Sequence, residues 1–255
     1  MDLSLPTESL DRYKSASQRA RVSTEPWAEA NLFCPACDSE RINALPTGTR
    51  ASDFVCPSCD SRFQLKSKSS DIGNRVVDGA YSAMRDAITN DKTPSLFLLH
   101  YQLPRLTVED LLLIPHFAFS LSLLEKRKPL SPTARRAGWV GCNFLLDRIP
   151  ADAKISVVDS GKAISPDSVR KAYKKVRPLE KLNIKERGWT LDVLNVVRSL
   201  GKKEFLLQDV YAHTSALAAL HPDNHNVQPK IRQQLQELRD LGFLTFDGPG
   251  RYTLI

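Results

Sequence analysis

Two Cys-x₂-Cys pairs constrain the fold of this chain more than any other feature of its sequence. Cys34 and Cys37 form the first pair, and Cys56 and Cys59 form the second, with 18 residues between the pairs. Each pair offers two thiolates to one side, and four thiolates complete a tetrahedral Zn²⁺ site. Such a site has no open position for water, which predicts a structural zinc ion. Free or redox-active thiols are the alternative interpretation.

The second cysteine pair is flanked by polar residues of a different kind. Asp53 precedes it, and Gln64 and Lys66 follow it. In a strand the side chains alternate, so Phe63 and Leu65 should point inward while Gln64 and Lys66 share the opposite face. A zinc ion bound by the cysteines would hold these two stems close together.

These three polar residues suit a second metal. Asp53 and the side-chain oxygen of Gln64 are hard ligands of the type that Mg²⁺ prefers. Lys66 is placed to orient an attacking water and to stabilise charge on a phosphate. Taken alone, the pattern Asp-x₁₀-Gln-x-Lys occurs by chance in many surface strands. A solvated hairpin face is therefore the open alternative.

Composition favours a globular protein with an anionic partner. The chain has 255 residues, 42% hydrophobic and 25% charged, which is ordinary for a globular fold. Its net charge of +7 favours nucleic acid as a partner. No apolar run is long enough to span a membrane, and the N-terminus lacks the pattern of a secretory signal. We expect a cytoplasmic protein, because cysteines that bind metal suit a reducing compartment.

Residues 1–180 carry the pattern of an α/β or α+β domain. Helices are predicted at 8–30 and 78–88, and strands at 63–66, 95–99, 111–114 and 155–158. Residues 160–186 are strongly charged, which indicates a helix or a linker that leaves this domain.

Residues 186–255 carry the pattern of a winged helix. Helices are predicted at 189–200, 208–220 and 229–241, followed by strands at 243–246 and 251–254 around a turn at 247–250. In the third helix Ile231, Leu235 and Leu238 should point inward. Three helices followed by a two-stranded wing are typical of this relative of the helix-turn-helix.

Several segments resemble the family of DpnI-like methyl-directed type II restriction endonucleases. They are residues 53–68, 78–81, 126–139, 187–190 and 230–236, and the string Pro-Leu-x-Pro-Thr-Ala-Arg-Arg-Ala-Gly-Trp at 129–139 is the most specific. The resemblance covers residue 12 to the end. It implies a PD-(D/E)XK nuclease domain with an embedded zinc site and a C-terminal winged helix. It also implies Mg²⁺-dependent cleavage of double-stranded DNA at GATC sites, with N6-methylation of the adenine required.

Within this resemblance Asp53 and Lys66 carry over directly as catalytic residues, and Asp53 as a magnesium ligand. Gln64 departs from the pattern of the PD-(D/E)XK superfamily, in which the usual residue at this place is Glu or Asp. An amide still offers one oxygen to Mg²⁺ but removes a negative charge, so weaker metal binding is expected.

Two groups of residues are candidates for DNA recognition. Arg135, Arg136 and Trp139 form a basic and aromatic cluster that can contact phosphate, guanine and a methyl group together. Near the start of the third helix of the winged helix, the candidates are Asn226, Gln228, Lys230, Arg232 and Gln233. The alternatives are a buried core tryptophan for Trp139 and a solvated face for the helix. The lysines at 171–175 should touch phosphates or nothing.

Two classes of function stay open at this point. The first is a Mg²⁺-dependent endonuclease, monomeric in solution; the second is a methylated-DNA-binding regulator that does not cut. The spacing of His221 and His225 is typical of metal ligands, but the residues between them indicate a polar loop. Cys142 is expected to be a small buried residue. Glu25 and Glu29 are able to supply a further carboxylate, yet nothing in the sequence selects either one.

Overall fold

The computed structural model describes residues 1–8, 10–49 and 51–255. The described chain divides into two compact units, each assembled from segments that are distant in the sequence. Unit 1 contains Met1–Gly73, Lys92–His116 and Asp152–Arg177, and unit 2 contains Asn74–Asp91, Phe117–Ala151 and Pro178–Ile255. The domain boundaries expected at residues 180 and 186 stay a prediction.

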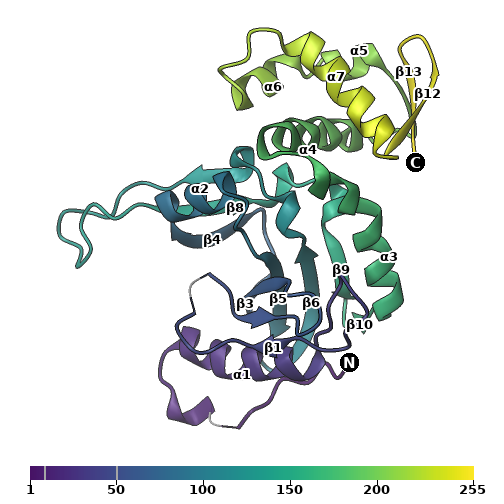
Figure 1. Ribbon diagram of the computed structural model, residues 1–255. Coiled ribbons are helices and arrows are strands. Elements are labelled where there is room, and N and C mark those ends of the chain that lie inside the picture. Colours follow the sequence, from purple (N-terminus) through teal and green to yellow (C-terminus); the bar gives the residue numbers. More distant parts are fainter. Residues whose placement is uncertain (9, 50) are drawn as a thin grey trace. The chain divides into compact units, whose positions relative to one another are not determined.

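Unit 1 is organised around one mixed sheet, which has seven strands in the described residues (Figure 1). In sheet order the strands are β1 (Asn43–Ala44), β2 (Phe54–Val55), β3 (Arg62–Lys68), β5 (Ser95–Gln102), β6 (Thr107–Ile114), β9 (Ile155–Asp159) and β10 (Lys162–Ala163). β3 and β5 run parallel, whereas the other neighbours run antiparallel. The strands predicted in this domain are all confirmed, although β10 extends the sheet beyond β9.

The centre of this sheet is fully buried. Residues 96–99 of β5 are each at most 4% exposed, and Leu111, Leu113 and Ile114 of β6 are fully buried. A continuous apolar run of this kind forms a stable strand when both faces of the sheet are covered. The buried strand β5 pairs with β3, which carries Gln64 and Lys66.

Two helices pack against the sheet of unit 1. α1 (Ala16–Asn31) lies along β1 and β3, and α3 (Pro166–Val176) lies along β9. Trp27 fixes α1, because its ring is buried and its Nε1 donates a hydrogen bond to the carbonyl oxygen of Asp2 at 2.8 Å. The helix predicted at 8–30 begins later than expected, at Ala16. Residue 9 of the predicted range lies outside the described residues. α3 accounts for part of the charged segment at 160–186.

The first half of unit 2 is a small antiparallel sheet with one helix. Its strands are ordered β4 (Arg75–Ala80), β8 (Gly141–Leu145) and β7 (Leu124–Lys126), and α2 (Tyr81–Thr89) follows β4. The predicted helix at 78–88 was thus wrong at its start. Asp78 pairs with Cys142 of β8 in the sheet, and this long-range pairing outweighs the local helical spacing of the apolar residues.

The second half of unit 2 is a winged helix. Its helices are α4 (Ile184–Ser199), α5 (Leu207–Tyr211), α6 (Thr214–Leu220) and α7 (Val227–Asp240), and its sheet has the order β11 (Glu204–Leu206), β13 (Arg251–Leu254), β12 (Leu244–Gly248). The predicted fold class, a mixed α/β domain with a four-cysteine cluster followed by a winged helix, is confirmed.

Several details of the winged helix differ from the sequence-based prediction, and α4, for example, begins at Ile184 rather than at residue 189. The helix expected at 208–220 is broken into α5 and α6, because the Thr214 hydroxyl donates to the carbonyl oxygen of Tyr211 at 2.6 Å and competes with the helical pattern. The sheet also gains β11, which pairs with β13. The turn expected at 247–250 is shorter, because β12 continues to Gly248 and leaves only Pro249 and Gly250 between the strands; Gly250 has a φ of 69° that favours glycine.

The inward face of α7 is as predicted. Ile231, Leu235 and Leu238 are fully buried, and the buried Gln234 accepts a hydrogen bond from the Thr190 hydroxyl of α4 at 2.6 Å. These contacts fix the rotation of α7 about its axis, and this rotation determines which side chains lie on its outer face.

The remaining regular elements are short 3₁₀ segments: η1 (Leu10–Arg12), η2 (His116–Ala118), η3 (Leu121–Leu123), η4 (Leu146–Arg148), η5 (Ala151–Ala153) and η6 (Arg177–Lys181). Across the described residues, every helix is too short or too polar to traverse a bilayer.

Candidate functional site

The four cysteines of the two Cys-x₂-Cys pairs converge on one point of unit 1. Their sulfur atoms all lie within 4.8 Å of one another, with 3.6 Å between Cys34 and Cys59 and 3.5 Å between Cys37 and Cys56. A disulfide needs about 2.05 Å between sulfurs. Tetrahedral zinc, with Zn–S bonds of about 2.3 Å, separates them by about 3.8 Å. The geometry therefore fits a zinc ion and excludes disulfides.

The thiols of this cluster differ in acidity. Burial raises the pKa of the Cys34 thiol. Burial acts in the same direction on Cys56, but the backbone N–H groups of Ser58 and Cys59 favour its thiolate, and its pKa falls to about 7. The N–H of Ser58 lies 3.4 Å from the Cys56 sulfur. The thiolate form of Cys56 is thus favoured, and binding of a zinc ion would displace the remaining thiol protons of the cluster.

Asp53 lies beside Gln64 across a pair of strands. Its backbone N–H donates to the carbonyl oxygen of Phe63 at 2.8 Å, and its carboxylate accepts from the N–H of Leu65 at 2.8 Å. Phe63 and Leu65 are the residues on either side of Gln64 in β3. The structure therefore brings Asp53 and Gln64 to neighbouring positions, as the sequence predicts.

Gln64 and Lys66 are both partly exposed, whereas Phe63 is buried. They occupy alternate positions of β3, opposite Leu96 and Leu98 of β5. Because alternate residues of a strand share a face, Gln64 and Lys66 point to the same side of the sheet. Lys66 keeps partial access to solvent.

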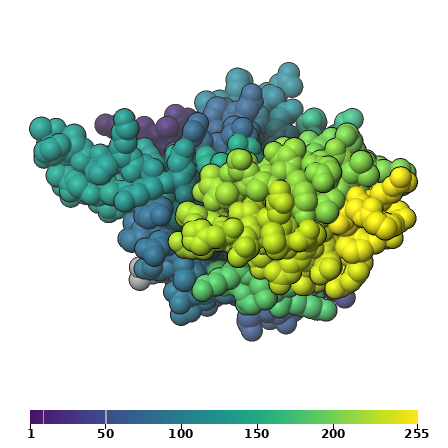
Figure 2. All heavy atoms as spheres, turned by 90° about the horizontal axis from the view of Figure 1, so that it is seen from above, coloured from purple at the N-terminus to yellow at the C-terminus, as the bar shows by residue number. Residues whose placement is uncertain are grey.

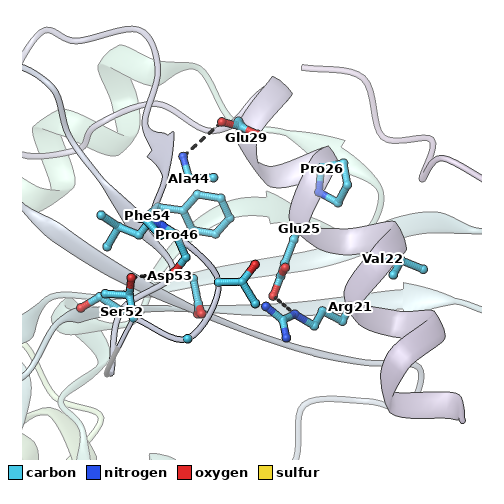
Figure 3. Close-up of a pocket in the computed structure, with 14 residues that line it drawn as sticks. Arg21, Val22, Glu25, Pro26, Glu29, Ala44, Pro46, Ser52, Asp53 and Phe54 are labelled. Carbon is cyan, nitrogen blue, oxygen red and sulfur yellow. Dashed lines mark hydrogen bonds and ion pairs between the residues drawn. The ribbon is translucent and has the colours of Figure 1, made fainter.

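A pocket of about 310 Å³ opens next to Asp53. Glu25 and Glu29 of α1 line it together with Asp53, so three carboxylates face one pocket (Figure 3). Glu25 is paired with Arg21 at 2.8 Å, and Glu29 accepts from the N–H of Ala44 at 3.2 Å. The sequence did not select either glutamate, because only the docking of α1 against β1 and β3 brings them to Asp53.

The three carboxylates line the pocket without converging. Among the described residues, only the four cysteines gather three or more Cys, His, Asp or Glu ligand atoms within 4.8 Å. Oxygen donors from Asp53, Gln64 and the pocket nevertheless have the chemistry of a Mg²⁺ site, in which water completes the coordination.

The segment between β7 and β8, residues 127–140, forms a basic arm in unit 2. Figures 1 and 2 show it in teal as a loop that extends away from its sheet. Arg135 and Arg136 are exposed on the arm, and the Arg136 guanidinium lies 4.7 Å from the centroid of the Trp139 ring. Trp139 is half-buried against Gly141, where a Cβ would come within 2.8 Å of the ring. The tryptophan is therefore held at the base of the arm rather than in the core.

The second predicted group lies on the outer face of α7 and at Asn226, which directly precedes this helix. Asn226, Gln228, Arg232 and Gln233 are exposed, whereas Lys230 is partly buried and donates to the side-chain oxygen of Gln233 at 2.9 Å. The face is polar and basic, as a recognition helix requires.

The histidine pair and the fifth cysteine have structural surroundings. His221 stacks on Trp189, with 3.7 Å between the ring centroids, and its Nε2 lies 2.8 Å from the carboxylate of Asp192. His225 is exposed. Cys142 is fully buried in β8, as expected.

A four-thiolate site in a mixed α/β domain, joined to a helix-turn-helix domain with strands, defines a class of DNA-acting proteins. Two family models match the chain: DpnI, described as the Dam-replacing family, over residues 1–182, and DpnI_C, described as the Dam-replacing HTH domain, over residues 185–253. The chain therefore belongs to the Dam-replacing family of DpnI. This membership implies a methyl-dependent restriction endonuclease that binds DNA.

Proposed function

We propose that this protein is a Mg²⁺-dependent endonuclease that cleaves double-stranded DNA at GATC sites carrying N6-methyladenine. In this proposal residues 1–180 are a PD-(D/E)XK nuclease domain stabilised by zinc, and residues 186–255 are a DNA-binding winged helix. The observation that carries it is the placement of Asp53 beside Gln64, by hydrogen bonds to the two neighbours of Gln64 in β3.

Asp53 and Gln64 would hold the magnesium ion through oxygen atoms. When bound, Mg²⁺ supplies Lewis-acid polarisation of the scissile phosphate and acidifies water. Lys66, on the same face of β3 as Gln64, orients the attacking water and stabilises the negative charge that develops on the phosphate. The zinc cluster keeps the Asp53 stem against the Gln64 and Lys66 stem.

The neutral amide of Gln64 leaves this site one negative charge short of the PD-(D/E)XK superfamily pattern. Glu25 and Glu29 line the same pocket as Asp53 and add negative potential there, although Arg21 offsets the charge of Glu25. Cation binding depends on the summed local charge as well as on direct ligands. The pocket therefore supports metal binding by this chain despite the amide.

Unit 2 supplies the DNA-reading surfaces in this proposal. The methyl group adds one apolar contact in the major groove, and the half-buried Trp139 ring under Arg136 offers a matching aromatic surface. Arg135 and Arg136 on the arm, and Asn226, Gln228, Lys230, Arg232 and Gln233 on α7, contact phosphates and base edges.

The competing function is a methylated-DNA reader that does not cut, and the amide of Gln64 is the observation that favours it. Purified protein is incubated with matched supercoiled plasmids, one methylated at adenine N6 in GATC and one unmethylated, in Mg²⁺, in Mn²⁺ and in EDTA. We expect double-strand cleavage of the methylated plasmid alone, and none in EDTA. Selective binding of the methylated plasmid without cleavage in either metal would select the reader.

A further inference from the structure

Arg170 of α3 lies against the first cysteine knuckle (residues 34–39), from which it is distant in the sequence. Its Nε donates to the carbonyl oxygens of Cys34 at 3.3 Å and Cys37 at 3.0 Å, and a terminal nitrogen donates to that of Ser39 at 3.0 Å. The guanidinium carbon lies 5.3 Å from the centroid of the Phe33 ring. One side chain thus bonds to the backbone at both ends of the knuckle.

Two of the three acceptors belong to residues that supply sulfur ligands. Holding the carbonyls of Cys34 and Cys37 fixes the backbone from which both thiolates project. A guanidinium can bond three carbonyls at once because its donors form a rigid planar fork, which a lysine ammonium lacks. Groups around metal ligands orient those ligands and contribute to metal affinity.

Charge adds to this geometric effect. Four thiolates around one Zn²⁺ carry a net charge of about −2, so a guanidinium on the knuckle is attracted to the loaded site. Only 13% of the Arg170 side chain is exposed, which limits screening by water. The nearby Lys171 and Lys174 are exposed, so Arg170 is distinct from the basic stretch in which it lies.

We propose that Arg170 is a positioning residue for the zinc site, which holds the Cys34–Cys37 knuckle in ligand geometry and slows release of the ion. The role couples the docking of α3 to zinc retention. It is independent of the proposed nuclease activity, because it concerns the hold on zinc alone.

The test follows zinc release from full-length protein to an excess of a chromogenic chelator. Arg170→Ala should release zinc about tenfold faster than the parent or more, the lower end of the loss seen when a group that orients metal ligands is removed. Arg170→Lys should fall between the two, because it keeps the charge without the fork. The matched control Lys174→Ala, an exposed cation on the same helix, should behave as the parent does.

A second measurement separates positioning of the ligands from general support of the fold. In cobalt-substituted protein, Arg170→Ala should shift the d–d absorption bands, which report the geometry of the four thiolates. Unshifted bands with parental release would overturn the proposal, as would a Lys174→Ala variant that loses zinc equally fast. If Arg170→Ala fails to fold, the Arg170→Lys variant provides the test. Zinc release from Arg170→Lys at the parental rate would then overturn the proposal. If the purified parent protein contains no zinc, the proposal is overturned before any variant is measured.

Discussion

The zinc cluster and the proposed magnesium site both take residues from the β2–β3 region of unit 1, but they are built in different ways. The cluster takes its ligands from two pairs of cysteines, and the two members of each pair are three residues apart in sequence. The four sulfur atoms lie within 4.8 Å of one another. The proposed magnesium site takes Asp53 from the segment just before β2 and Gln64 from β3, and its pocket takes carboxylates from α1. The first site is defined by local spacing, whereas the second exists only after the strands pair and the helix docks.

This difference implies an order of dependence. Strong ligands that are close in sequence can bind zinc early and then hold the hairpin, because metal binding and folding of such segments are coupled. Weak oxygen ligands drawn from several elements cannot organise their own backbone. Loss of zinc should therefore disable both sites, and loss of a residue on the β3 face should disable one.

Cys56→Ser should have the largest effect. The variant lacks one thiolate at the knuckle next to Asp53, so we expect poor zinc retention, a melting temperature lower by about 10 °C or more and no cleavage. Calorimetry with zinc analysis checks this. Cys142→Ala is the matched control, because it removes a buried cysteine outside the cluster and should cost only about 1 kcal/mol. If Cys56→Ser melts and cuts as the parent does, the zinc ion has no part in holding the site.

Lys66→Ala should separate the two sites. We expect cleavage of methylated DNA to fall by about 10²–10⁴-fold, the usual contribution of a group that manages protons and charge in the transition state. Zinc content and binding of methylated DNA should stay near parental values. Single-turnover cleavage and a binding assay in Ca²⁺ measure the two quantities.

Lys68→Ala is the control for this variant, because Lys68 is an exposed lysine two residues further along β3. It should cut at close to the parental rate. An active Lys66→Ala variant, or an equal loss in Lys68→Ala, would remove Lys66 from the mechanism.

The same distinction between local and tertiary construction explains what the sequence could predict. The cysteine spacing, the apolar runs of β5 and β6, and the helical spacing of α7 are local patterns, and each of them formed as expected. The alternation in β3 likewise placed Gln64 and Lys66 on one face. These patterns are imposed by burial over a few residues, which a single sequence displays directly.

Features made by distant segments were missed. Asp78 entered β4 because β8 pairs with it, and Arg170 reached the zinc knuckle from a helix more than 130 residues away. Glu25 joined the Asp53 pocket only through the docking of α1. The one sequence signal for Arg170 was its place in the charged segment at 160–186, which indicated a helix or a linker and gave no sign of its partners.

Gln64→Glu should have the smallest effect and tests the weaker of the two metal sites most directly. A carboxylate in place of the amide adds one negative charge beside Asp53, so the Mg²⁺ concentration for half-maximal cleavage should fall by about three- to tenfold; partial screening by water keeps the gain near 1 kcal/mol. Titration of Mg²⁺ against the cleavage rate measures this, and Gln64→Ala, which removes the oxygen, should shift the midpoint upward. A midpoint unchanged in both variants would show that residue 64 is not a ligand. A parent that binds methylated DNA without cutting, beside a Gln64→Glu variant that cuts, would instead identify the amide as the change that turned a nuclease into a reader.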